Sequence, residues 1–260
     1  MSTYKFQRTP IMSTYLLAFF VGEMDYTETT AHMPHTGNEV LVRVYTPKGE
    51  QEKGKFSLDL TAKTLEFFSE YFDVDYPLPK MDMIGLPDFA AGAMENWGLI
   101  TYRSKLIYVE EGVTSKATKE YIASIVCHEL AHQWFGNLVT MEWWTDLWLN
   151  EGFATWVGNM AADHFYPEWN VWESFISSEF NRALDLDQLD SSHPIQVTVN
   201  KASEVDEIFD AISYSKGASV IRMLVNFLGE DTFRAGLRVY LNKYKYSNAK
   251  TENLWEELST

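Results

Sequence analysis

The sequence predicts an α+β fold in which a small mixed sheet comes first and helices follow. Segments with the length and pattern of strands lie in the first half of the 260-residue chain. From about residue 116 onward, apolar residues recur instead at helical spacing. The length suits one large domain, or one domain with part of another.

The first predicted element is a buried strand over residues 12–21, MSTYLLAFFV, whose apolar run is too short to span a bilayer. Residues 39–46 alternate apolar and polar side chains, as a half-buried strand does. An amphipathic helix is predicted over 58–72, where apolar residues recur on one face. Residues 80–86 and 98–109 are predicted to be extended.

Four helices are predicted in the second half, over residues 116–135, from near 146 through 156, 210–228 and 231–244. The pair Gly136-Asn137 directly after the first of them is a typical helix stop. This order of strands and then helices favours α+β over an alternating α/β chain.

The charge of the chain argues against two classes of partner. Its 21 basic and 37 acidic residues give a net charge of -16. Nucleic acids and anionic membranes need clustered basic residues, so neither is expected to bind. One cysteine, Cys127, excludes an internal disulfide, and no signal peptide is visible. The default expectation is the cytoplasm, and the oligomeric state is left open.

The central motif is His128-Glu129-Leu130-Ala131-His132. Residues four apart on a helix share one face, so both imidazoles can bind one metal ion. The flanking sequence carries no Pro or Gly up to Phe135, as such a helix requires. The alternative is a pair of surface histidines beside an ordinary glutamate. Cys127 points about 100° away from His128 and is predicted to be a small core residue.

A catalytic zinc site has a third protein ligand and one open position. Glu151 is the candidate, because a chain reversal after Gly136 would return it past the first helix. Its apolar neighbours Trp148 and Phe153 favour a buried carboxylate that needs a partner, over a solvated one. Two imidazoles and a carboxylate favour one Zn²⁺ per chain, although other transition metals would fit. Glu129 is then the general base that takes a proton from metal-activated water.

Three motifs in this order resemble those of the gluzincin zinc aminopeptidases of the aminopeptidase N family, closest to the cytosolic puromycin-sensitive and fungal branch. They are, along the chain, the segment Gly92-Ala93-Met94-Glu95-Asn96-Trp97-Gly98, the metal motif with Glu151 and the segment 210–217. The resemblance implies a thermolysin-like zinc metallopeptidase catalytic domain over residues 23–260. It also implies that residues 1–22 end a preceding β-domain.

The resemblance implies roles for residues that spacing alone would not select. Glu95 is expected to bind the charged amino end of a peptide, and small residues Gly92 and Ala93 would let the substrate lie alongside as an added strand. Met94 and Asn96 complete this expected substrate-binding segment. Tyr214 is expected to donate a hydrogen bond to the oxyanion. Without the resemblance, a core tyrosine would be the better interpretation.

The predicted function is therefore hydrolysis of the N-terminal peptide bond of peptides that carry a free amino end. Two alternatives stay open. One is a non-catalytic module that binds peptide N-termini, and the other is an endopeptidase with the same metal site. Trp134, Trp143, Trp144 and Trp148 surround the motifs, and packing is the favoured interpretation for most of them.

Overall fold

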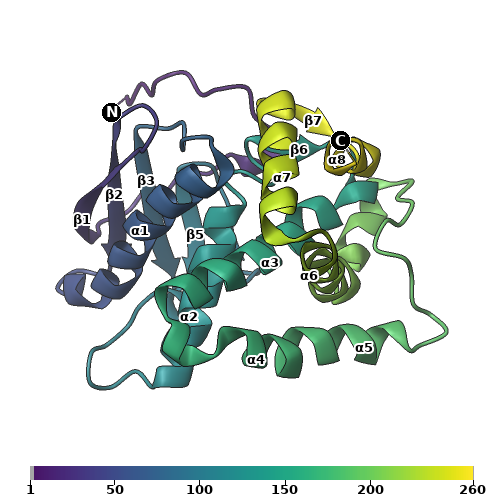
Figure 1. Ribbon diagram of the computed structural model, residues 1–260. Helices are drawn as coiled ribbons and strands as arrows, with labels where there is room; N and C mark the ends of the chain where they lie inside the picture. The colour runs from purple at the N-terminus through teal and green to yellow at the C-terminus, as the bar shows by residue number, and fades with distance from the viewer. Residues whose placement is uncertain (1–2, 260) are drawn as a thin grey trace.

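The computed structural model describes residues 3–259 and confirms the α+β class (Figure 1). A sheet lies at one end of the molecule, helices α6–α8 lie at the other, and helices α2 and α3 lie between them. The first sheet contains β1 (Asp25–His32), β2 (Glu39–Thr46), β3 (Lys80–Leu86), β4 (Ala93–Met94) and β5 (Leu99–Arg103).

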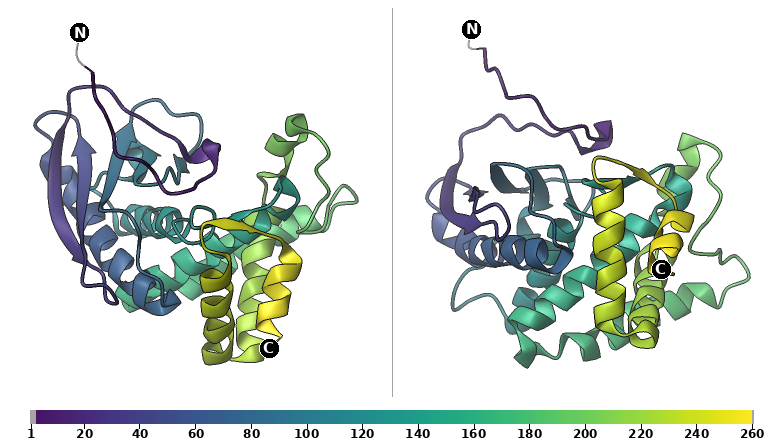
Figure 2. Two further views of the ribbon diagram at one scale, coloured as in Figure 1. Left: turned by 90° about the horizontal axis from the view of Figure 1, so that it is seen from above. Right: turned by 45° about the horizontal axis from the view of Figure 1, so that its top comes forward.

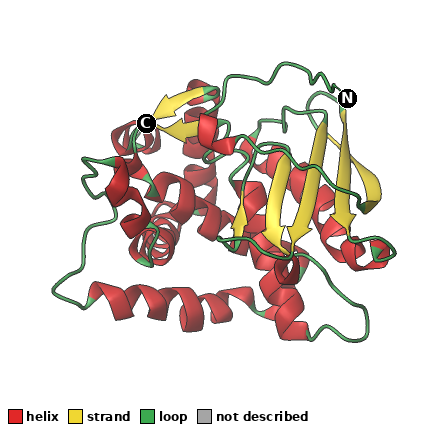
Figure 3. Ribbon diagram, turned by 180° about the vertical axis from the view of Figure 1, so that it is seen from behind, coloured by secondary structure: helices red, strands yellow, loops and turns green. Residues whose placement is uncertain are grey.

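This first sheet is mixed, as predicted. Its strand order is β1-β2-β3-β5-β4. The β2–β3 and β3–β5 pairs are parallel, whereas β1 and β4 run antiparallel to their neighbours. Helix α1 (Lys55–Phe72) connects β2 to β3, and the view from behind shows the strands in front of the helices (Figure 3). The short β4 therefore forms one edge of the sheet.

The predicted strands at 39–46 and 80–86 are confirmed, and in β2 buried residues alternate with exposed or partly buried ones. The extended segment predicted over 98–109 is shorter, because β5 ends at Arg103 and a 3₁₀ turn follows at Ser104–Leu106. Strand β1 was not predicted, since its sequence DYTETTAH is too polar to show a buried face.

The buried strand predicted over residues 12–21 is wrong. The segment is irregular apart from one 3₁₀ turn at Thr14–Leu16. Leu16 is buried, but Leu17 and Phe19 are 68% and 83% exposed. An apolar run is buried only when another element covers it. Among residues 3–259, no strand pairs with the segment 12–21. Figure 2 shows the segment crossing the top of the molecule, and residues 1 and 2 lie outside the described residues.

The helices of the second half follow the predicted order. They are α2 (Lys116–Ala131), α3 (Trp148–Phe165), α4 (Val171–Phe175), α5 (Asn181–Asp187), α6 (Gly217–Leu228), α7 (Glu230–Tyr244) and α8 (Thr251–Leu258). Two π-helical turns, Ile176–Phe180 and Ile212–Lys216, precede α5 and α6. A second sheet consists of two short parallel strands, β6 (Val139–Met141) and β7 (Ser247–Ala249). Helices α4, α5 and α8 were not predicted. Helix α2 ends four residues earlier than predicted.

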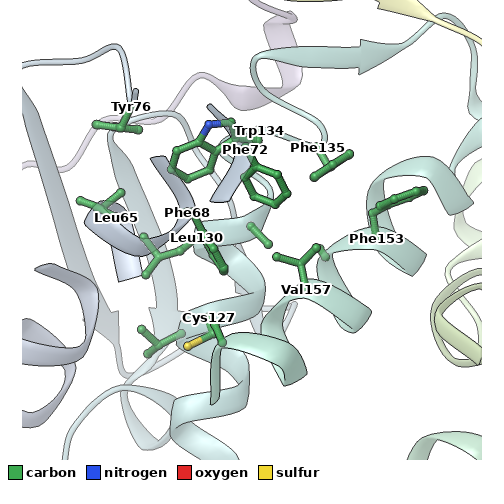
Figure 4. Close-up of a cluster of buried hydrophobic side chains, with 14 of the residues drawn as sticks. Leu65, Phe68, Phe72, Tyr76, Cys127, Leu130, Trp134, Phe135, Phe153 and Val157 are labelled. Atoms are coloured by element: carbon green, nitrogen blue, oxygen red, sulfur yellow. The ribbon is translucent and has the colours of Figure 1, made fainter. Parts of the chain in front are cut away.

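An aromatic core joins α1 to α2 and α3 (Figure 4). Phe68 and Phe72 of α1 contact Trp134, whose ring lies edge-on to Phe68 at 5.7 Å between centroids. Phe135 stacks on Phe153 of α3 at 4.6 Å. Burial of such rings contributes about 1.5–3 kcal/mol each. This core therefore fixes the end of α2 against the start of α3, where the predicted metal ligands lie.

Candidate functional site

The last turn of α2 presents the two histidines of the central motif. His128 and His132 lie one turn apart, and their Nε2 atoms are 3.0 Å apart. Their rings meet edge to face at 4.6 Å between centroids. A spacing of four residues on a helix brings side chains together in this way.

Glu151 reaches the same point from the first turn of α3. Its Oε2 lies 3.2 Å from His132 Nε2 and 3.3 Å from His128 Nε2. The reversal expected after α2 is present: Gly136 has a φ of +131°, and a Cβ there would lie 3.3 Å from Asn150 Nδ2. A glycine therefore permits both the backbone conformation and the close approach of the two helices.

The second nitrogen of each imidazole also has a partner. His132 Nδ1 lies 2.9 Å from the carbonyl oxygen of Phe135, and His128 Nδ1 lies 3.4 Å from Thr155 Oγ1. A carbonyl accepts only, so Nδ1 of His132 carries a hydrogen, and Nε2 is the nitrogen that can bind a metal ion once it has lost its own. Such outer contacts orient the rings of metal-ligating histidines. Neither partner was identified from the sequence.

The three converging atoms fit a tetrahedral ion. Ligands at roughly 2.0–2.1 Å around tetrahedral zinc are about 3.3 Å from one another. The separations of 3.0, 3.2 and 3.3 Å among the Nε2 and Oε2 atoms approach that value. Among the described residues, two groups have the spacing to hold a metal ion, and both contain His132. One ion at a time therefore fits this site.

The second of these groups adds Glu95 and Glu129 to His132. Both carboxyl groups are buried, and Glu129 Oε2 has no hydrogen-bond partner among the described residues. An unpartnered buried carboxylate oxygen is costly unless something binds to it. Glu129 lies beside the proposed ligand atoms without belonging to the first group, which is the arrangement that a general base requires.

The electrostatics of the site favour a cation. Burial raises the pKa of Glu95, and it raises that of Glu129 well above the usual range. Burial also opposes the charge of His132, but Glu95 and Glu151 outweigh it and raise the pKa of that ring to about 10. Burial raises the pKa of Glu151 in turn, yet the His132 charge, together with hydrogen bonds from both histidines and the charge of His128, outweighs it and lowers the value to about 2. Burial lowers the pKa of His128.

The segment 92–96 borders the site at the edge of the sheet. Residues Ala93 and Met94 form β4, paired on one side with β5. The carbonyl oxygen of Glu95 accepts a hydrogen bond of 2.8 Å from Asn137 Nδ2. Asn96 accepts one of 2.9 Å from Thr101 Oγ1. These contacts fix the backbone while the Glu95 side chain lies with Glu129 and His132.

Tyr214 lies against His128 from the π-helical turn before α6. Its ring stacks on that of His128, with centroids 6.0 Å apart and an interplanar angle of 11°. Burial and the Glu151 carboxylate raise the pKa of its hydroxyl well above the usual value. The hydroxyl therefore keeps its proton and can donate it in a hydrogen bond.

The predicted tryptophan cluster divides into two pairs. Trp134 and Trp148 are fully buried in the core, which confirms packing for both. Trp143 is 45% exposed. Trp144 contacts the rings of Tyr15 and Phe209, with centroids 5.7 and 6.1 Å away. Phe209 in turn contacts the ring of Tyr214, at 6.4 Å between centroids.

Tyr15 was missed as a site residue. Asn150 Nδ2 donates to its hydroxyl at 3.4 Å, and Asn96 Nδ2 donates to the carbonyl oxygen of Leu16 at 3.3 Å. These contacts hold the N-terminal segment against α3 and against the segment that follows β4. No local pattern in the sequence signals such long-range contacts.

Residues 56–260 match the model of the peptidase family M1 domain. The chain belongs to peptidase family M1. Three similar proteins are "Aminopeptidase M1-A" of Oryza sativa subsp. japonica, "Aminopeptidase M1" of Arabidopsis thaliana and "Aminopeptidase 2, mitochondrial" of Saccharomyces cerevisiae, which are 59%, 57% and 53% identical over 97–98% of this chain. The resemblance inferred from the motifs is thereby confirmed.

This M1 chain spans only 28% of the length of the two plant relatives and 26% of the yeast one. Among its described residues, no helix combines the length and apolar character needed to cross a bilayer.

Proposed function

We propose that this chain carries the zinc-dependent catalytic site of an aminopeptidase, which removes single residues from the amino end of peptides. The observation that carries this proposal is the convergence of His128 Nε2, His132 Nε2 and Glu151 Oε2 within 3.3 Å of one another. The aminopeptidase names of its relatives support the same activity. The proposed fold is thermolysin-like, with residues 23–260 as the catalytic domain. The origin of residues 1–22 in a preceding β-domain stays a prediction.

Zinc held by these three residues would lower the pKa of water and polarise the peptide carbonyl. Glu129 takes the water proton and delivers it to the leaving amine, because its Oε2 is buried and free of other hydrogen bonds. The hydroxyl of Tyr214 donates a hydrogen bond to the carbonyl oxygen as negative charge develops on it. In this proposal Glu129 transfers the proton and Tyr214 stabilises the negative charge on the carbonyl oxygen.

Glu95 makes the enzyme an exopeptidase in this proposal. A free peptide amino group has a pKa of about 7.7–8.0 and is mostly charged at neutral pH. The buried Glu95 carboxylate, which shares its surroundings with Glu129, pairs with that charge at a fixed distance from the zinc ligands. Gly92, Ala93, Met94 and Asn96 complete the substrate-binding segment, and the free side of β4 lets the peptide add as a strand.

One experiment separates the three candidate functions. The zinc-loaded chain is assayed with a set of single-residue amides and with a peptide in free and N-acetylated forms. We expect cleavage of the free forms and resistance of the acetylated one. The variant Glu95→Gln should lose most of this discrimination, whereas Glu173→Gln, an exposed change on α4, should keep it. Equal cleavage of both forms would indicate an endopeptidase, and binding without cleavage a non-catalytic module.

The proposed location is the cytoplasm. The single cysteine is buried and suits a reducing compartment. The yeast relative, by its name, is instead a mitochondrial protein. Fractionation of cells with an antibody to the chain tests the location, and enrichment with a mitochondrial marker would overturn it.

A further inference from the structure

We propose that Asp210 and His193 form a positioning pair that holds Tyr214 at the active site. The inference rests on the proposed function, because it concerns the residue assigned there as a hydrogen-bond donor. Neither residue belongs to the two donor groups that could hold a metal ion. Asp210 begins the segment 210–217 singled out from the sequence, but no role followed for it or for His193. The pair acts through the backbone of the turn that carries Tyr214.

Asp210 caps this turn. Its Oδ1 accepts hydrogen bonds from the backbone N–H groups of Ile212 (2.9 Å) and Ser213 (3.1 Å). The first N–H groups of any helical turn lack partners within the turn, and an aspartate at this position satisfies them. Tyr214 N donates to the Asp210 carbonyl oxygen at 3.2 Å. One residue thus holds three successive N–H groups up to and including that of Tyr214.

His193 holds the other carboxylate oxygen of Asp210. Its Nε2 lies 2.6 Å from Asp210 Oδ2, and its Nδ1 lies 2.7 Å from the carbonyl oxygen of Pro194. Carboxylate and carbonyl oxygens both accept, so both contacts are satisfied when both ring nitrogens carry hydrogen. The two side chains are each 22% exposed. The ring therefore fixes the rotation of the Asp210 carboxylate from a segment seventeen residues away.

The far half of the turn has separate supports, and in the near half Ser213 Oγ adds to the Asp210 contacts by donating to the carbonyl oxygen of Ile208 at 2.7 Å. Ser215 Oγ donates to Glu179 Oε2 at 2.5 Å, and Lys216 Nζ contacts Asp187 Oδ1 at 2.5 Å. A π-helical turn is a rare conformation that occurs often at functional sites. With both halves held, the Tyr214 ring stacks nearly parallel to that of His128.

The pair therefore controls turnover through the position of one hydroxyl. Misplacement of a catalytic group by about 1 Å can cost roughly 100-fold in rate. Loss of the cap should misplace the Tyr214 hydroxyl while leaving the metal ligands and Glu95 in place. The expected signature is a lower kcat with an unchanged KM and unchanged zinc content.

The test is a double-mutant cycle in the zinc-loaded chain. We expect Asp210→Ala to lower kcat by roughly 10- to 100-fold, with KM unchanged within about twofold. His193→Ala should give a smaller loss in the same direction, and the exposed control Asp190→Ala none. In a Tyr214→Phe background, Asp210→Ala should cause no further loss, because the hydroxyl that it positions is absent.

Hydrogen exchange supplies a readout that does not depend on activity. The amides of Ile212 and Ser213 should exchange faster in Asp210→Ala than in the parent chain. Asp210→Asn keeps an oxygen for these amides but loses the carboxylate that faces His193, so it should restore part of the protection and of kcat. It also replaces Asp210→Ala if that variant does not fold.

If Asp210→Ala lowered kcat equally in the parent chain and in the Tyr214→Phe background, the pairing with Tyr214 would be overturned. Unchanged exchange and turnover in Asp210→Ala would overturn it as well. If Tyr214→Phe left kcat unchanged, the role of that hydroxyl in the proposed function would be refuted. Exchange at Ile212 and Ser213 would then still decide whether the pair holds the turn.

Discussion

Gly158 of α3 lies against the backbone of His128 in α2. A Cβ built at Gly158 would lie 2.8 Å from His128 N and 3.0 Å from its Cα. Gly158 is seven residues after Glu151, and Thr155 is four after it, so all three lie on one face of α3. This face carries the proposed third ligand, the hydrogen-bond partner of His128 and the close contact between the two helices.

The variant Gly158→Ala should therefore force the two helices apart. Overpacking against backbone atoms costs about 1–3 kcal/mol, and the better helix propensity of alanine returns about 1 kcal/mol. We expect a lower free energy of unfolding in urea and weaker zinc binding. The neighbouring Asn159→Ala, which loses only a hydrogen bond to Thr155 O, serves as the control. An unchanged unfolding midpoint and zinc affinity would show that the close contact is not needed.

The variant Glu129→Gln separates metal binding from catalysis. Glu129 does not belong to the group formed by His128, His132 and Glu151, so the variant should retain its zinc. It should lose about 10²–10⁴-fold in kcat, the contribution typical of a general base. Metal analysis and a peptide assay on the same sample measure both quantities, with Glu173→Gln as the matched control. Normal turnover by Glu129→Gln would remove it as the base.

Tyr108 should make stability depend on alkaline pH. Burial raises the pKa of its hydroxyl to about 12, although a hydrogen bond with Gly85 partly opposes this. The folded state thus favours the neutral form, which donates to the carbonyl oxygen of Tyr45 at 2.7 Å. The resulting stability is fully present below the unfolded pKa of about 10 and is lost as the pH rises through about 12.

Urea unfolding of the parent chain and of Tyr108→Phe tests this. The parent should be the more stable protein at about pH 8, and the difference between the two should narrow toward about pH 11. The other tyrosines are common to both proteins and cancel in the comparison. A difference that stayed constant over this range would contradict the raised pKa.

The proposed metal ligands could be predicted because their signal is local. His128 and His132 need only a helix between them, and Gly136 marks the reversal that returns Glu151. The helix register then determines which side chains meet. The structure confirms that these three side chains meet within 3.3 Å. Thr155 could also have been found, since it follows Glu151 by one turn of the same helix.

The parts that sequence reasoning missed depend on contacts between distant segments. The apolar run 12–21 has the composition of a strand, but no neighbouring strand among the described residues pairs with it. The bond between His193 and Asp210 joins an irregular segment to a turn, and no periodic pattern marks either one. Tyr15 meets Asn150 across more than a hundred residues. Tertiary packing decides such contacts, and local propensity does not record it.

The most direct test of the account is the zinc content of single variants, measured by metal analysis after dialysis. Two donor groups share His132, and zinc is proposed to bind the one that contains His128 and Glu151. We expect one zinc per chain in the parent, in Glu95→Gln and in Glu129→Gln, and loss of zinc in His128→Ala, His132→Ala and Glu151→Ala. Full zinc content in Glu151→Ala, with loss in Glu95→Gln, would contradict it.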